Sequence, residues 1–285
     1  MNAAILITGA TGNVGSEIVK ILLKLDVPFR AAIRKNGDEN KVGLSKEDCV
    51  TFDFLDARTF EPTFEGIKAV FLMRPPDLAN PEKEINPAIQ AAKKAGVKRI
   101  VFMSLLGAEK NFFVPHHKIE KIIAASGISY TFLRPSFFMQ NLSGTHAHEI
   151  KAMNEILVPA GRGKTSFIDA RDIAAVAVEV LTQAGFENKA LPLTGPAALN
   201  YLELAEILTQ ELGRPITYSN PSVLRFIRAM RKRHFKWAYI AVMSAIYTVN
   251  KLGLAARLTP DVEQILGRKP ISFQQFAKDY RDAWL

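Results

Sequence analysis

The sequence predicts an α/β protein built on a doubly wound parallel sheet, with a smaller, mostly helical lobe at the C-terminal end. Three observations lead to this class. In the first half of the 285 residues, short apolar runs alternate with longer segments of helical period. A glycine-rich turn joins the first apolar run to the first helical segment. From Pro221 onward the pattern is helical to the C-terminus.

Six apolar runs in the first half are predicted to be strands. Each is short and apolar at nearly every position, as expected of strands buried on both faces of a sheet. They are Ala3–Thr8, Phe29–Ile33, Cys49–Phe54, Ala69–Met73, Arg99–Ser104 and Tyr130–Leu133. Helical period lies between several of them, at Val14–Leu25, Pro81–Ala95 and His117–Ala125. Repeated strand–helix alternation of this kind is typical of a Rossmann-type sheet.

The second half has a less regular pattern. Its predicted elements are short strands at Ser166–Asp169 and Leu191–Leu193 and helices at Asp172–Leu181 and Tyr201–Leu212. Asn200 is the predicted N-cap of the last helix, and Gly213 follows its end.

The composition indicates the cellular compartment of the protein and excludes some kinds of metal site. Hydrophobic residues make up 48% of the chain, enough for a sizeable core. The single cysteine, Cys49, excludes internal disulfides and cysteine-cluster metal sites. Together with the lack of a secretory signal at the start, it predicts a protein of the reducing cytoplasm. The net charge is +9, and six positive charges fall within residues 225–236, which contain no acid.

The glycine-rich turn reads TGATGNVG and follows a strand and opens a helix. In that context Gly9 permits a sharp turn, Gly12 lets the backbone approach a pyrophosphate, and Gly15 lets the helix pack against the sheet. The turn residues predicted to bind a dinucleotide are Gly9, Thr11, Gly12, Asn13, Val14 and Gly15. The alternative is a tight turn without a ligand.

The residues after the second predicted strand indicate which dinucleotide binds. NAD-binding proteins usually carry an acid there, which contacts the ribose. Here the strand ends in Arg34 and Lys35, and the acids Asp38 and Glu39 lie beyond it, in an expected loop. A guanidinium can hold the 2′-phosphate through a bidentate contact, so NADP(H) is the predicted cofactor. A solvated loop charge is the alternative for Arg34.

Several motifs resemble the NmrA-like family of atypical short-chain dehydrogenases/reductases. They are TGATGNVG, VTFDFLD, YTFLRPSFFMQN, SFIDARDIA and LTPDVEQILGRKP, which preserve the family's order over almost the whole chain. The chain is similar to the branch with triphenylmethane-reductase-like and NAD(P)H:quinone-reductase-like proteins. The same fold also occurs in redox-sensing regulators.

The resemblance implies that cofactor contacts lie at the carboxyl ends of the third to sixth strands. The implied residues are Asp53 and Phe54 beside the adenine; Leu72, Met73 and Arg74 under the pyrophosphate and ribose; Ser104 and Leu105 near the nicotinamide ribose; and Pro135, Ser136, Phe137 and Phe138 at the nicotinamide. For the two phenylalanines, packing in the core is the alternative.

The sequence departs from the wider superfamily at the proton donor. Ordinary members use a Tyr-x-x-x-Lys pair, whereas the corresponding region here, NFFVPHHKIEKII, has no tyrosine. His116, His117 and Lys121 are the candidate catalytic residues in its place. The predicted function is hydride transfer from NADPH to a small electrophile such as a quinone or conjugated aromatic. The alternative is a catalytically inactive NADP(H)-binding redox sensor.

We expect residues 1–155 to form the NADP-binding Rossmann domain, with residues 165–195 returning to it. Residues 196–285 are expected to form a mostly helical substrate or lid lobe. The expected oligomeric state is a monomer or a homodimer.

Three further segments could suggest other ligands. GRGKTS, at residues 161–166, lacks the first glycine of a phosphate-binding loop, since that position is Val158. His146, His148 and Glu149 could suggest metal ligands, but a solvated or cleft-lining segment is the favoured interpretation and no metal is predicted. The basic segment at residues 225–236 has three interpretations. In order of preference, they are a solvated face of a lid helix, a contact for an anionic substrate or membrane surface, and a nucleic-acid contact.

Overall fold

The computed structural model describes residues 4–35 and 37–285 of the chain. The described residues group into two compact units. The first unit comprises Met1–Pro135, Ala170–Leu193 and Asp261–Gly267. The second unit comprises Ser136–Asp169, Thr194–Pro260 and Arg268–Leu285. The chain therefore passes between the units several times.

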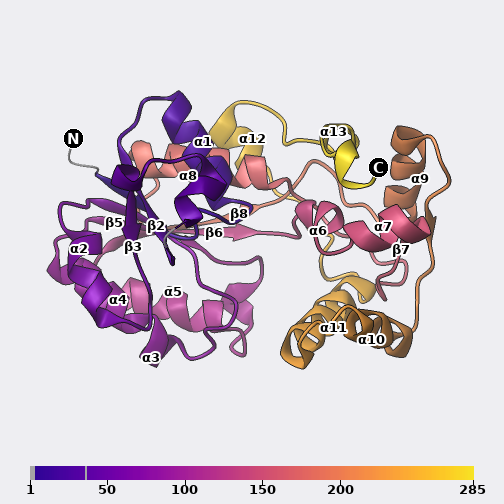
Figure 1. Cartoon of the computed structure of the whole chain (residues 1–285), viewed down its shortest axis with the longest axis horizontal. Coiled ribbons are helices and arrows are strands. Elements are labelled where there is room, and N and C mark those ends of the chain that lie inside the picture. Colours follow the sequence, from indigo (N-terminus) through magenta and orange to yellow (C-terminus); the bar gives the residue numbers. More distant parts are fainter. Residues whose placement is uncertain (1–3, 36) are drawn as a thin grey trace. The chain divides into compact units, whose positions relative to one another are not determined.

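The first unit is built, within the described residues, on a seven-stranded parallel sheet in the order β3-β2-β1-β4-β5-β6-β8 (Figure 1). The strands are β1 (Ile5–Ile7), β2 (Phe29–Ile33), β3 (Cys49–Thr51), β4 (Ala69–Leu72), β5 (Arg99–Met103), β6 (Ser129–Pro135) and β8 (Lys189–Leu193). All six strands predicted in the first half are confirmed, although Ala3 lies outside the described residues. Because the strand order reverses between β1 and β4, the sheet has a switch point beside β1, where doubly wound proteins bind ligands.

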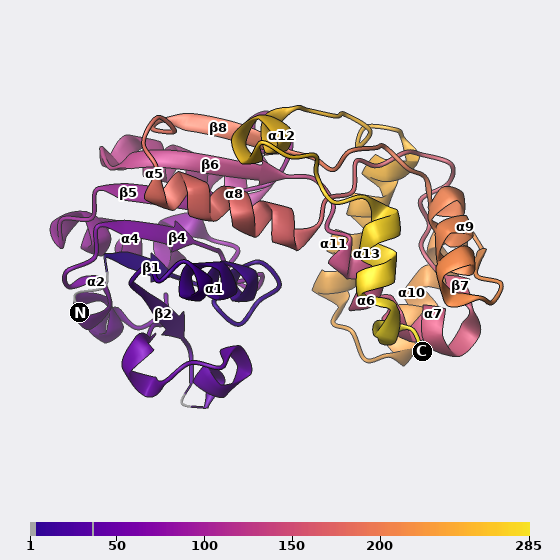
Figure 2. The ribbon, with the colours of Figure 1, turned by 90° about the horizontal axis from the view of Figure 1, so that it is seen from above.

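Helices cover both faces of this sheet (Figures 1 and 2). One face carries α1 (Gly15–Lys24), α8 (Ala170–Thr182) and α12 (Asp261–Leu266). The other carries α2 (Phe60–Phe64), α3 (Pro81–Glu84), α4 (Asn86–Lys94) and α5 (Pro115–Ser126). The single helix predicted over Pro81–Ala95 is wrong, because it is broken into α3 and α4. Pro87 has no N–H to donate to the carbonyl of Lys83, so the helix must restart there.

The second unit is mostly helical, as expected for the C-terminal lobe. Its helices are α6 (Gln140–Ser143), α7 (Ala147–Met153), α9 (Tyr201–Leu212), α10 (Val223–Lys232), α11 (Trp237–Lys251) and α13 (Phe273–Asp279). Strands β7 (Glu155–Ile156) and β9 (Thr217–Tyr218) form a small parallel pair. An aromatic core holds these elements together and includes fully buried Phe226, Phe276 and Trp284.

Helix α9 begins and ends as the sequence predicts. The Asn200 side chain accepts hydrogen bonds from the amides of Leu202 and Glu203, at 2.9 and 3.0 Å. The Glu203 carboxylate accepts one from the Asn200 amide at 2.7 Å, which completes a capping box. Gly213 ends the helix with a φ of +66°.

Two predictions for the second half are corrected. Ser166–Asp169 is not a strand, because successive amides donate to different segments: Thr165 to Leu199, Ser166 to Ala255, and Ile168 to Phe137. Helical structure after Pro221 is interrupted at residues 233–236, 252–260 and 267–272. Gly253 and Gly267 adopt positive φ there, which is typical of a residue that ends a helix.

Candidate functional site

A cavity of about 220 Å³ opens in the first unit at the carboxyl ends of β1, β2 and β4. It is lined by Thr8, Gly9, Thr11, Gly12, Ala32, Ile33, Arg34, Asp38, Phe52, Asp53, Phe54, Met73, Arg74, Pro75, Pro76 and Leu78. The cavity therefore lies at the switch point of the sheet, where the strand order predicts a ligand.

The glycine turn forms one side of the cavity. Gly9 adopts a φ of +65°, and the Gly12 amide donates to the Gly9 carbonyl at 2.9 Å. A Cβ on residue 15 would lie 2.1 Å from that same carbonyl oxygen. Only glycine fits at this position without a shift of the backbone. This contact brings the N-terminus of α1 to the cavity, where its first amides and its positive dipole end favour an anion.

Thr8 joins the turn to the neighbouring strand. Its hydroxyl donates to the Phe71 carbonyl at 3.0 Å and accepts from the Met73 amide at 2.8 Å. Met73 follows β4 and packs under Gly9, where its sulfur would lie 2.9 Å from any Cβ on that residue. The carboxyl ends of β1 and β4 are thus held together directly beneath the turn.

Arg34 and Asp38 bring opposite charges to the rim of the cavity. Arg34 is exposed. The Asp38 carboxylate accepts a hydrogen bond from Lys41 Nζ at 2.6 Å and from the Lys35 amide at 3.3 Å. The bond from Lys41 is the main reason that the pKa of Asp38 is lowered. Asp38 is therefore ionised but locally paired, whereas the exposed Arg34 lines the cavity as a cation.

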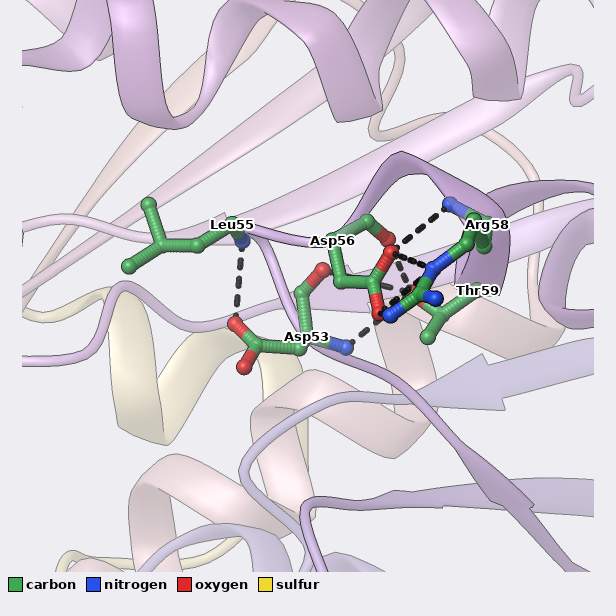
Figure 3. A network of polar contacts seen from close by, with 5 residues as sticks. All are labelled: Asp53, Leu55, Asp56, Arg58 and Thr59. Carbon is green, nitrogen blue, oxygen red and sulfur yellow. Dashed lines mark hydrogen bonds and ion pairs between the residues drawn. The ribbon is translucent and has the colours of Figure 1, made fainter.

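The turn after β3 is held by a polar network (Figure 3). The Asp53 carboxylate accepts from the Leu55 amide at 2.9 Å, and the Asp53 amide donates to the Thr59 hydroxyl at 3.2 Å. The same hydroxyl lies 2.7 Å from the Asp56 carbonyl, to which it donates. Arg58 pairs with the Asp56 carboxylate at 2.7 Å. These bonds fix Asp53 at the cavity wall, and the second oxygen of its carboxylate lies outside this network.

Asp53 lies between two phenylalanines in the sequence, and their rings contact each other. Phe52 and Phe54 are both buried, and their ring centroids lie 4.7 Å apart at an interplanar angle of 66°. Phe52 also contacts the ring of Phe60 and that of Phe64. This part of the cavity is a rigid apolar wall, which suits a planar heterocycle.

Arg74 closes the far side of the cavity. Its Nη1 donates to the carbonyls of Pro75, Pro76 and Leu78, at 2.9, 2.9 and 2.6 Å. Burial lowers the pKa of Arg74, although the charges of Asp77 and Glu84 oppose this effect. Arg74 therefore holds its own loop in place and keeps a positive charge beside the cavity.

The three candidate catalytic residues do not line this cavity. Burial, followed by the charge of Arg74, lowers the pKa of His116 to about 4, so its imidazole is neutral at pH 7. His117 is buried, and its Nδ1 donates to the Ala108 carbonyl at 2.9 Å. The Lys121 ammonium lies 5.7 Å from the centre of the Phe112 ring.

A buried charged network at the ends of β5 and β6 was missed by the sequence reasoning. The Ser104 hydroxyl donates to Glu120 Oε1 at 2.6 Å. Arg134 binds the same carboxylate through Nε and Nη2, at 3.0 and 2.6 Å, and pairs with Glu109 at 3.2 Å. Because the Ser104 proton points to Glu120, the hydroxyl presents only lone pairs to any other partner. The sequence did contain one signal of this network, because Glu120 lies between Ile119 and Ile123 on the apolar face of a predicted helix.

The structure divides the predicted cofactor residues into three groups. Gly9, Thr11, Gly12, Arg34, Asp53, Phe54, Met73 and Arg74 line the cavity. Asn13, Val14, Gly15, Lys35, Leu72, Ser104, Leu105 and Pro135 belong to the first unit but not to the cavity lining. Ser136 and Phe137 belong to the second unit. Asp38, Thr8 and Phe52 line the cavity without having been predicted to do so.

The segment suggestive of metal ligands has other roles in the second unit. His146 is buried, and its Nε2 lies 2.5 Å from the Tyr247 hydroxyl. Burial, then the charge of Arg233, lowers the pKa of His146 to about 3. Glu149 pairs with Arg233 at 2.9 Å. In the described part of the chain, no three His, Cys, Asp or Glu side chains are placed to hold a metal ion.

Comparison with known proteins gives consistent matches. The model of the NmrA-like family matches residues 1–257. The NAD(P)H azoreductase of Xenophilus azovorans is 34% identical over 285 residues, which covers 98% of this chain and 99% of that protein. The structure of the Escherichia coli NADPH-dependent quinone oxidoreductase QOR2 complexed with NADPH is similar, with a TM-score of 0.85, 26% identity and coverage of 96% of this chain and 99% of that one.

A second structure supports the fold alone. The Citrobacter sp. triphenylmethane reductase complexed with NADP(H) has a TM-score of 0.85 at 24% identity, covering 97% of this chain and 99% of that one.

The lowered pKa of His116, a half-buried residue, predicts a pH dependence of stability. Its folded-state pKa of about 4 lies below the usual value of 6.5, so the unfolded chain takes up a proton first as the pH falls. The stabilisation is complete above pH 6.5 and is lost toward pH 4. Replacing His116→Gln should therefore reduce the loss of unfolding free energy between pH 6.5 and 5 by about 1.5 kcal/mol.

Urea denaturation at both pH values measures this difference. His148→Gln, at an exposed histidine, is the control for loss of an imidazole. A His116→Gln variant that loses as much stability as the unmodified protein would contradict the burial of a neutral His116.

Proposed function

Because the chain belongs to the NmrA-like family, we propose that it is an NADPH-dependent reductase of a small electrophile, such as a quinone or a conjugated aromatic. The observation that carries the proposal is the cavity at the switch point, with its glycine turn, its exposed Arg34 and its aromatic wall. The names of full-length relatives support it, since one is an NAD(P)H azoreductase and another an NADPH-dependent quinone oxidoreductase. These names favour an enzyme over an inactive redox sensor.

The cofactor fits the cavity residue by residue in this proposal. The adenine lies against Phe54 and beside Asp53, and Arg34 binds the 2′-phosphate through its guanidinium. The pyrophosphate lies over the turn from Gly9 to Gly15, where the amides at the start of α1 face it. Met73 and Arg74 support the other side, and the charge of Arg74 offsets part of that of the phosphates. The paired state of Asp38 limits its repulsion of the 2′-phosphate.

The nicotinamide end is proposed to lie near Ser104 and Leu105. NADPH supplies the hydride when bound. The chain's contribution is positional: Glu120 and Arg134 fix the Ser104 hydroxyl as an acceptor for a ribose hydroxyl. Pro135, Ser136 and Phe137 remain proposed neighbours of the nicotinamide. A neutral His116 can hydrogen-bond to a substrate but is not an imidazolium acid at pH 7.

The catalytic roles of His117 and Lys121 remain predictions. We propose that the first unit is the cofactor domain and that the residues of 196–285 that belong to the second unit, 196–260 and 268–285, supply the substrate lobe. We also propose that the protein acts in the cytoplasm as a monomer or homodimer. Among the described residues no helix is long and apolar enough to cross a bilayer.

A reduction assay tests the proposed activity. The purified protein is incubated with NADPH and a panel of a benzoquinone, a naphthoquinone, an azo dye and a triphenylmethane dye, and absorbance at the NADPH band is followed. We expect oxidation of NADPH above the rate without protein for at least one acceptor, with reduced product in equal amount. Tight NADPH binding without turnover on any acceptor would instead favour the redox sensor.

The charge of Arg34 should decide the choice between cofactors. Arg34→Asp removes the guanidinium and adds a carboxylate that repels a 2′-phosphate, so the Kd for NADPH should rise by about 10- to 100-fold. The Kd for NADH, which lacks this phosphate, should stay equal or fall. Titration of protein fluorescence with each nucleotide measures both constants. Lys94→Asp makes the same charge change on exposed α4 and is the matched control. Equal effects of the two substitutions on NADPH binding would refute the role of Arg34.

A further inference from the structure

The hairpin of α10 and α11 has an unusual charge composition. Residues 223–251, which form this hairpin, contain seven lysines and arginines and no aspartate or glutamate. The two helices pack against each other within the second unit (Figures 1 and 2). The net charge of the whole protein is +9, so this hairpin carries most of the excess.

Two of these cations hold the hairpin in place. Arg225 pairs with Glu155 of β7 at 2.8 Å, and Arg233 pairs with Glu149 of α7 at 2.9 Å. Both carboxylates are largely buried. These ion pairs are structural, and they set the direction in which the rest of α10 faces.

Three other cations have no such partner. Arg228, Lys232 and Lys236 are exposed, and none makes an ion pair within residues 4–35 and 37–285. Arg228 and Lys232 follow Leu224 at intervals of four residues, so Leu224, Arg228 and Lys232 lie on one face of α10. Leu224 itself is exposed. This face therefore combines an apolar side chain with unpaired positive charge.

Helix α11 is apolar on both its inner and its outer side. The inner side is buried through Ile240, Met243, Tyr247 and Asn250. The outer side consists of Ala238, Val242, Ala245, Val249 and Leu252, all of them exposed. Val242 keeps 57% of its surface exposed and Leu252 67%. A helix that faces water on one side normally carries polar residues there, so this apolar stripe indicates an interaction surface.

An aromatic side chain stands where the two helices meet. Trp237 opens α11 and is 62% exposed, and the Arg231 guanidinium lies 4.9 Å from the centre of its ring. An exposed tryptophan beside cations is typical of the interface between lipid headgroups and acyl chains.

We propose that this α10–α11 surface, formed by Leu224, Arg228, Lys232, Lys236, Trp237, Val242, Val249 and Leu252, docks on an anionic lipid bilayer. The cations contact lipid phosphates, while the outer side of α11 enters the boundary between headgroups and acyl chains. The helix lies in the plane of the membrane and does not cross it. This inference goes beyond the proposed reductase activity and does not depend on it.

Charge selects this occupant over the alternatives. A second copy of the chain would place the hairpin's five cations other than Arg225 and Arg233 against the same five, with no acid in either hairpin to pair with them. A nucleic acid would satisfy the cations but would leave the apolar outer side of α11 against phosphate or water. An anionic bilayer offers both negative charge and an apolar layer within a few ångströms of each other.

Vesicle sedimentation tests the proposal with the full chain. We use vesicles of phosphatidylcholine alone and of phosphatidylcholine with phosphatidylglycerol. The protein should sediment with the anionic vesicles at low salt, less at high salt, and weakly with the neutral ones. The pair Arg228→Glu and Lys232→Glu should lower the partition coefficient at least about tenfold. The pair Val242→Ser and Val249→Ser should lower it too, and should do so also at high salt.

Controls separate docking from misfolding and from simple charge. The pair Lys93→Glu and Lys94→Glu makes the same charge change on exposed residues of α4 in the first unit and should leave binding within about twofold of the unmodified protein. Circular dichroism and the melting temperature show that each variant folds. The readout is sedimentation alone, so loss of reductase activity would not be mistaken for loss of docking.

Four outcomes would overturn the proposal. The first is no sedimentation with anionic vesicles at low salt. The second is equal loss with the α4 control pair. The third is a dimer, measured by light scattering, that the Val242→Ser and Val249→Ser pair abolishes while vesicle binding is absent, which would assign the surface to a second copy. Binding of a DNA duplex without binding of vesicles would likewise assign it to nucleic acid.

Discussion

The close contact between residue 15 and the Gly9 carbonyl governs the arrangement of the first unit. A Cβ at residue 15 would lie 2.1 Å from that oxygen, so the start of α1 can reach the end of β1 only through a glycine. This contact sets the height of α1 above the sheet and brings its N-terminal amides to the switch point. Thr8 and Met73 then tie the neighbouring β4 to the same place. The glycine side of the cavity and the positive end of α1 beside it both follow from this one approach.

The chain uses charge differently in its two units. In the first unit, Arg34 and Arg74 line one cavity, and the two carboxylates that line it are held by local donors, Asp38 by Lys41 and Asp53 by the Leu55 amide. In the second unit, Glu149 and Glu155 form ion pairs with Arg233 and Arg225, and the α10–α11 hairpin has no acid of its own. Its other cations therefore remain available at the surface. A cofactor site and a lipid-facing surface are thus compatible within one basic chain.

Much of the first unit could be predicted because its signals are local. The strands are continuous apolar runs, and the glycine spacing falls between a strand and a helix. Asp38 could not be placed, because the 3-10 helix that returns it to the cavity depends on Gly37 and Gly43 at positive φ. The link between Ser104 and Arg134 was missed for a related reason, since both reach Glu120 from different elements. The bridges around Ser166 depend on segments far away in the sequence. Tertiary partners decide such features, and one sequence does not reveal them.

The central claim is that NADP(H) occupies the cavity beside the glycine turn. A crystal structure of the protein grown with NADP⁺ tests it most directly. We predict the pyrophosphate over the amides that follow Gly12, the 2′-phosphate within hydrogen-bond distance of the Arg34 guanidinium, and the adenine against Phe54. A nucleotide bound elsewhere, or an adenosine ribose paired with Asp38 while Arg34 points to solvent, would contradict the account.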